Sequence, residues 1–161
     1  MKRRWGMMIV IFALATATLL FTDRTPRATS NVVDGSTATV RMGAAEITAE
    51  VAVSDQARSR GLSGRPSLSD HEGMLFVFPQ PGRYRFWMQS MLFPLDIIWI
   101  EHNRIVDMAE DVPAPNPEVV TVTPKARATY VLEVAAGTAA RLGIRVGDLV
   151  RIEFDNRRKN T

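Results

Sequence analysis

Apolar residues are most concentrated in residues 73–101, and their pattern there predicts the centre of the fold. Met74–Phe78 is apolar at every position and is bounded by a glycine and a proline, which is typical of a short strand buried on both faces. Leu95–Ile100 is apolar at every position except Asp96, which predicts a second central strand. The remaining segments are shorter and are expected to pack against these strands.

Residues 83–89 alternate between apolar and polar side chains, as expected for a strand with one buried face. The side that is expected to be buried carries Tyr84, Phe86 and Met88. The other side carries Arg83, Arg85, Trp87 and Gln89.

Further strands are predicted at Thr37–Met42, Glu46–Val53, Arg104–Ala109, Val119–Thr123, Tyr130–Val134 and Leu149–Phe154. Short helices are predicted at Asp55–Arg60, where Ser54 can cap the first turn, and at Gly137–Leu142. A glycine follows each helix, as is common where helices end. Asn103 predicts a tight turn between two strands, because asparagine tolerates the left-handed conformation.

Helix is too scarce in this pattern for βαβ crossovers, so the sheet is expected to be mainly antiparallel. We therefore predict a mainly β (β-rich α+β) fold. It is expected to be a single compact, barrel-like or sandwich-like antiparallel domain with two short helices, over residues 36–154. Residues 23–35 are polar with proline and glycine and predict a linker, and residues 155–161 predict a basic C-terminal tail.

The first 22 residues have the layout of a signal peptide or an N-terminal membrane anchor. Lys2, Arg3 and Arg4 are followed by residues 5–22, which contain no charged side chain. As a helix this run would be about 27 Å long, which is marginal for spanning, so both cleavage and retention as an anchor stay open. Basic residues before the run and acidic ones after it predict export to the periplasm or the extracellular space, with membrane contact only through residues 5–22.

The charge of the chain does not indicate nucleic-acid binding. The formal net charge is +3, from 20 basic and 17 acidic residues, and Lys2, Arg3 and Arg4 supply the whole excess. The sequence contains no cysteine, which excludes a disulfide framework, a thiol nucleophile and a zinc–thiolate site. The two histidines lack the spacing of a metal-binding pair, so we predict neither a metal site nor a cofactor.

Two acidic residues, Asp96 and Glu133, lie in predicted strands among apolar neighbours. A buried carboxylate needs hydrogen bonds or a charged partner, so Asp96 is either a structural group that holds the loop at residues 90–94 or a functional acid. If the face of the strand that carries Glu133 meets Asp96, the two form a carboxylate pair of the kind that acid–base catalysis uses. Asp96 and Glu133 are therefore the candidate catalytic residues.

The candidate ligand-binding residues are Trp87, Arg85, Gln89 and Arg60. Trp87 offers an aromatic surface flanked by the hydrogen-bond donors of Arg85 and Gln89, which suits sugar-like or planar ligands. The alternative is that Trp87 covers a second small core. Arg60 precedes a Ser- and Gly-rich loop and could bind a carboxylate or phosphate, although such arginines often pair with nearby acids.

Three segments together resemble the domain-of-unknown-function 192 family (DUF 192): RSRGLSGRPSLSDHEGMLFVF (58–78), FWMQSMLFPLDIIWIE (86–101) and YVLEVAAGTAARLGIRVGDLV (130–150). The resemblance covers the whole predicted domain. It implies a compact β-rich fold with short helices and, as in many members, a leader peptide. The sequence departs from the family pattern at residues 89–91, where Gln, Ser and Met stand in place of the usual Lys and Asn before a small hydroxyl residue. The resemblance implies no established activity.

Two classes of function remain. The first is a non-catalytic exported cell-envelope domain that binds a small polar ligand or an envelope partner. The second is an envelope hydrolase or lyase that uses Asp96 and Glu133. Catalysis predicts both carboxylates in one accessible cleft, whereas binding predicts an exposed Trp87 and at least one acid hydrogen-bonded to the backbone. The scarcity of catalytic residues favours binding.

Overall fold

The computed structural model describes residues 32–155 of the 161-residue chain. The predicted leader (residues 1–22) lies outside the described residues, as do most of the predicted linker and of the basic tail. Within residues 32–155, no helix is long and apolar enough to span a membrane.

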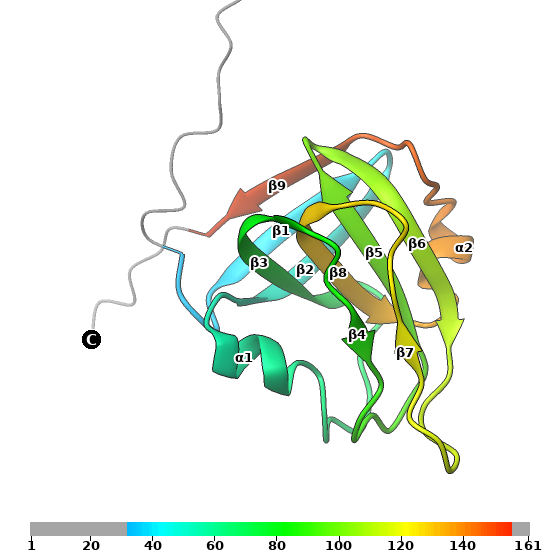
Figure 1. Ribbon diagram of the computed structural model, residues 1–161. Helices are drawn as coiled ribbons and strands as arrows, with labels where there is room; N and C mark the ends of the chain where they lie inside the picture. Colours follow the sequence, from blue (N-terminus) through cyan, green and yellow to red (C-terminus); the bar gives the residue numbers. More distant parts are fainter. Residues whose placement is uncertain (1–31, 156–161) are drawn as a thin grey trace, which may run out of the picture.

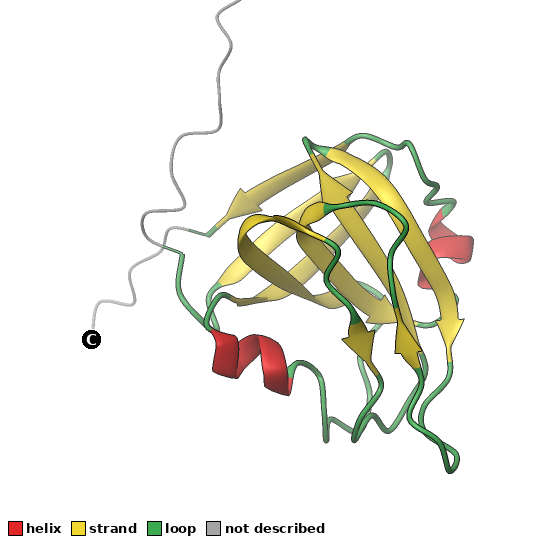
Figure 2. Cartoon of the chain, viewed as in Figure 1, coloured by secondary structure: helices red, strands yellow, loops and turns green. Residues whose placement is uncertain are grey.

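The described part contains nine strands and two short helices. The strands are β1 (Thr37–Met42), β2 (Ala45–Ala52), β3 (Glu72–Gly82), β4 (Phe86–Trp87), β5 (Leu95–Glu101), β6 (Arg104–Val112), β7 (Thr121–Val122), β8 (Ala128–Ala135) and β9 (Val150–Phe154). The helices are α1 (Asp55–Arg60) and α2 (Thr138–Leu142). Seven strands form one sheet in the order β6-β5-β8-β3-β2-β1-β9, and β4 pairs with β7 in a separate ribbon (Figures 1 and 2).

The seven-stranded sheet curls into a half-barrel (Figure 1). Its edge strands β6 and β9 meet at one end, where Arg104 and Leu149 form an isolated bridge. Next to this bridge the Val150 N–H donates to the Asn103 carbonyl over 2.8 Å. The predicted mainly β, mainly antiparallel fold with two short helices is confirmed.

One pairing departs from the prediction, because β2 and β3 run parallel. Parallel neighbours need a crossover connection, which is usually made by a long helix. Here the two turns of α1 and a long loop at residues 61–71 make that connection. A scarcity of helix therefore did not exclude a crossover, because the loop supplies the necessary length.

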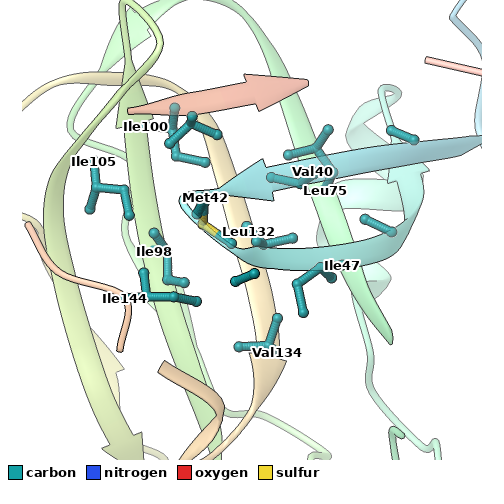
Figure 3. Packing of buried hydrophobic residues seen from close by; sticks show 14 of the residues in the cluster. Val40, Met42, Ile47, Leu75, Ile98, Ile100, Ile105, Leu132, Val134 and Ile144 are labelled. Atoms are coloured by element: carbon teal, nitrogen blue, oxygen red, sulfur yellow. The ribbon is translucent and has the colours of Figure 1, made fainter. Parts of the chain in front are cut away.

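The central strands β3, β5 and β8 are buried on both faces, which explains their continuous apolar runs. Alternate side chains point into the curl and form a first core with Val40, Met42, Ile47, Leu75, Ile98 and Leu132 (Figure 3). The other side chains form a second core on the outer face of the sheet, with Met74, Phe76, Phe86, Met88, Ile97 and Trp99. The β4–β7 ribbon and α1 cover this outer face, since both contribute residues to the second core.

The alternation predicted for residues 83–89 holds, although only Phe86 and Trp87 form a strand. Phe86 and Met88 are buried, whereas Arg85, Trp87 and Gln89 are exposed. The second core therefore holds one side of this segment and leaves the other at the surface.

Candidate functional site

A cavity of about 340 Å³ opens on the outer face of the sheet, beside α1 and the segment that contains β4. Its aromatic lining comes from Phe76, Phe78, Tyr84, Phe86 and Trp87. Its charged lining comes from Asp55, Arg58, Arg60, Arg85 and Glu133. A cavity of this size, which combines aromatic walls with charged groups, has the properties of a small-molecule site.

The N-terminal end of α1 is fixed by the chain that precedes β1. The Ser54 hydroxyl caps α1 by accepting the Ala57 N–H over 3.1 Å. Asp34 accepts the N–H groups of Val53 and Ser54 over 2.7 and 2.9 Å, and its hydrogen bond with the Ser54 hydroxyl lowers the pKa of this carboxyl. Residues 32–35, which the sequence assigned to the linker, are therefore bound to the domain and help to position one wall of the cavity.

Arg58 holds the cavity wall together. Its guanidinium donates to the carbonyl oxygens of Val53 and Val77, the latter over 2.8 Å, and pairs with Asp55. It also lies 4.9 Å from the centroid of the Phe78 ring. These contacts leave Arg58 with a structural role between α1 and β3.

Arg60 and Arg85, by contrast, are exposed at the cavity and form no ion pair within residues 32–155. Arg65, in the loop that follows α1, forms an ion pair with Glu50 over 2.6 Å. Two unpaired guanidinium groups at the opening of a cavity favour an anionic group on whatever binds there.

Trp87 is 53% exposed at the cavity, as the binding hypothesis predicted. The side chain of Gln89 is exposed, but this residue is not part of the lining. Its backbone carbonyl accepts the Ser63 hydroxyl over 2.9 Å, which joins the loop after α1 to the segment after β4. Of the four predicted ligand-binding residues, the structure thus brings Trp87, Arg85 and Arg60 together at the cavity.

Glu133 lines the cavity from β8 and is only 4% exposed. Its neighbours in the sheet are Met74 on β3 and Ile97 on β5, and neither can compensate a charge. Burial therefore raises the pKa of Glu133 from its ordinary 4.5 to about 8, so the group is mainly protonated at neutral pH.

The Glu133 carboxyl makes no hydrogen bond or ion pair with the side chains described in residues 32–155. No side-chain nitrogen or oxygen in that part of the chain is both fully buried and unpartnered. The Glu133 oxygens must then reach the cavity itself, where a ligand can meet them.

Asp96 is fully buried and has a structural environment. Its carboxylate accepts the backbone N–H groups of Asp111, Gly137 and Ala139, over 2.9, 3.3 and 2.8 Å. It therefore joins β5 to the end of β6 and to the start of α2. The sequence suggested instead that Asp96 holds the loop at residues 90–94. The structure does not place the hydrogen bonds of Asp96 there.

The structure does not bring Asp96 and Glu133 together. Glu133 lies opposite Ile97 in the β5–β8 ladder, while Asp96 lies opposite Val134. Successive residues of a strand point to opposite faces, so Asp96 faces the side of the first core and Glu133 faces the second. The predicted carboxylate pair is not formed.

Sequence reasoning missed the aromatic wall of the cavity. Phe76 and Phe78 come from β3, while Tyr84 and Phe86 come from the segment around β4. Phe76 meets Phe86 edge to face at 4.9 Å, and Phe78 stacks on Tyr84 at 3.5 Å. The segment between Phe78 and Tyr84 carries two prolines and a glycine, residues that often mark a change of chain direction. They are a local sign in the sequence that the two aromatic runs face each other.

The family model for DUF192, described as "Uncharacterized ACR", matches residues 37–152. None of the curated proteins compared with the chain matches it. A crystal structure of a provisionally assigned transcription regulator from Sinorhizobium meliloti 1021 is similar, with a TM-score of 0.66 and 29% identity, over 74% of this chain and 96% of that one. The crystal structure of a protein of unknown function from Novosphingobium aromaticivorans DSM 12444 is also similar, with a TM-score of 0.62 and 31% identity. The similarity covers 71% of this chain and 83% of that one.

Replacing Asp96 with leucine should lower the free energy of unfolding by about 2–4 kcal/mol, because three backbone N–H groups lose their acceptor. Asp96→Asn keeps one acceptor oxygen, so it should lower the free energy of unfolding by less. Urea denaturation of the two variants measures the difference. A leucine variant as stable as the native protein would show that these hydrogen bonds do not stabilise the fold.

Glu133 should make the stability of the protein fall with rising pH. Its pKa is about 8 in the folded state and near 4.5 when unfolded, so between these values the folded state binds more protons. Relative to Glu133→Gln, the free energy of unfolding of the native protein should fall by up to about 1.4 kcal/mol per pH unit between pH 5 and 8. Denaturation across this range is the measurement, with the exposed Glu110→Gln as the control. A difference between native protein and Glu133→Gln that is constant with pH contradicts the burial of an unpaired carboxyl.

Proposed function

The chain belongs to the DUF192 family, and we propose that it is a non-catalytic, exported cell-envelope domain whose cavity binds a small polar ligand. The observation that carries this proposal is the composition of the cavity. Aromatic side chains form its walls, the unpaired Arg60 and Arg85 lie at its opening, and Glu133 supplies a single buried carboxyl group.

The positions of the two candidate acids support binding over catalysis. Both carboxylate oxygens of Asp96 accept hydrogen bonds from backbone N–H groups, and Trp87 is exposed at the cavity. The other carboxylate of the cavity lining, Asp55, pairs with Arg58. The hydrolase or lyase alternative uses Asp96 together with Glu133, and these two acids lie on opposite faces of the sheet.

Export is proposed from the sequence of residues 1–22. A basic start followed by an uncharged apolar run is typical of a signal peptide or an anchor, and the matched domain begins after it, at residue 37. The proposal includes no nucleic-acid partner, because basic and acidic residues balance once this segment is set aside.

Binding is tested by NMR with a library of cell-envelope sugars and small anionic metabolites. Arg85→Ala and Trp87→Ala should each weaken binding by about tenfold, since each removes a charge-assisted hydrogen bond or a stacking surface. Arg145→Ala, an exposed change outside the cavity lining, should leave the affinity unchanged. A ligand that binds both cavity variants with native affinity would place its site elsewhere and contradict the proposal.

Export is tested by fusing residues 1–35 to a reporter enzyme that is active only outside the cytoplasm. The fusion should be active, and deletion of residues 5–22 should abolish the activity because the apolar run is lost. Equal reporter activity with and without this run would contradict export.

A further inference from the structure

We propose that the ligand presents a planar, uncharged amide or lactam edge to Glu133 and an anionic group to Arg60 and Arg85. This inference rests on the proposed function and names the chemical class that the same cavity selects. Its starting point is a carboxyl group that is 4% exposed, faces the cavity and has no partner among the described side chains.

The charged groups around Glu133 do not supply a countercharge. Helix α1 contributes Asp55, Arg58 and Arg60 to the same cavity, and the segment before β4 contributes Arg85. The strands β3 and β5 present only the apolar Met74 and Ile97 beside it. Arg58 is engaged with Asp55 and two carbonyl groups, while Arg60 and Arg85 are exposed at the opening.

A buried carboxyl without a countercharge is more stable in its protonated form. In that form it carries one O–H donor directly beside one carbonyl acceptor. The complementary group has an acceptor beside a donor in the same plane, which is the edge of a primary amide or a lactam. Two parallel hydrogen bonds then satisfy both sides without burying a charge.

The aromatic walls disfavour an ammonium group in the place of the amide. A cation binds over the face of a ring, but the ring faces here are largely engaged. Phe78 has Tyr84 stacked on it and the Arg58 guanidinium 4.9 Å from its centroid. Phe86 meets Phe76 and Trp99 edge to face. Among the described rings of the cavity, only Trp87 has no aromatic partner, so it can stack on a planar ligand.

The two arginines at the opening of the cavity favour an anionic group at the other end of the ligand. Arg60 and Arg85 are exposed there without ion pairs in the described part of the chain, and they can hold a carboxylate or phosphate. The ligand thus has an uncharged polar edge, a planar body and an anionic end.

The test uses three fragments that share one ring and one carboxylate: 4-carbamoylbenzoate, terephthalate and 4-(aminomethyl)benzoate. Dissociation constants are measured by NMR with the full-length protein at pH 6.5 and 9.5, following the Trp87 indole signal. At pH 6.5 the amide should bind at least about tenfold more tightly than the diacid or the amine, as expected for one matched pair of hydrogen bonds. At pH 9.5 its affinity should fall by at least about tenfold, because Glu133 loses its proton.

Variants at Glu133 separate recognition from folding. Glu133→Gln also presents a donor beside an acceptor, so it should bind 4-carbamoylbenzoate with similar affinity at both pH values. Glu133→Leu should lose the preference for the amide, and Arg145→Ala should behave as the native protein. If the leucine variant does not fold, the glutamine variant and the pH dependence of the native protein still decide the outcome.

Tighter binding of the amine would overturn the inference, because it would show that Glu133 acts as a charged partner. Equal binding of all three fragments, unchanged in Glu133→Leu, would also overturn it but would leave the proposed function intact. If no fragment shifts the Trp87 signal the inference fails, and the proposed function fails with it only if the metabolite library also gives no ligand.

Discussion

The fold depends on one constraint: the strands β3, β5 and β8 are apolar on both faces, so both faces must be covered. The curl of the sheet covers one face, because strands from both halves contribute to the first core (Figure 3). The other face needs a cover from outside the sheet, and α1 and the β4–β7 ribbon provide it. The parallel crossover from β2 to β3 passes through α1 and so places this helix over the outer face. The cavity lies beside the two covering elements.

The same constraint gives the two buried acids opposite environments. Asp96 lies on the face of the first core, close enough to α2 and the end of β6 to accept three backbone N–H groups. Glu133 lies on the other face, where side chains rather than backbone donors surround it. Burial without donors keeps Glu133 largely uncharged at neutral pH. One carboxylate therefore stabilises the fold, and the other is available to a ligand.

The sequence predicted the faces of single strands well, because side chains alternate with a period of two. The alternation at residues 83–89 correctly separated buried Phe86 from exposed Arg85 and Trp87, although the strand there is only two residues long. Register between distant strands has no such local signal. In the β5–β8 ladder Glu133 lies opposite Ile97 and not opposite Asp96, so the two acids lie on different faces of the sheet. This register is known only from the assembled sheet. The aromatic wall was missed for the same reason, since it requires the position of the segment around β4 relative to β3.

The most direct test of this account is the titration of the Glu133 side-chain carboxyl carbon by NMR in protein labelled with ¹³C at glutamate, assigned with Glu133→Gln. An unpaired carboxyl buried at the cavity predicts a midpoint near pH 8. A midpoint near 4.5, the ordinary value for glutamate, would show that the group is solvated or paired. The cavity would then lack the uncharged acid on which its proposed ligand class depends.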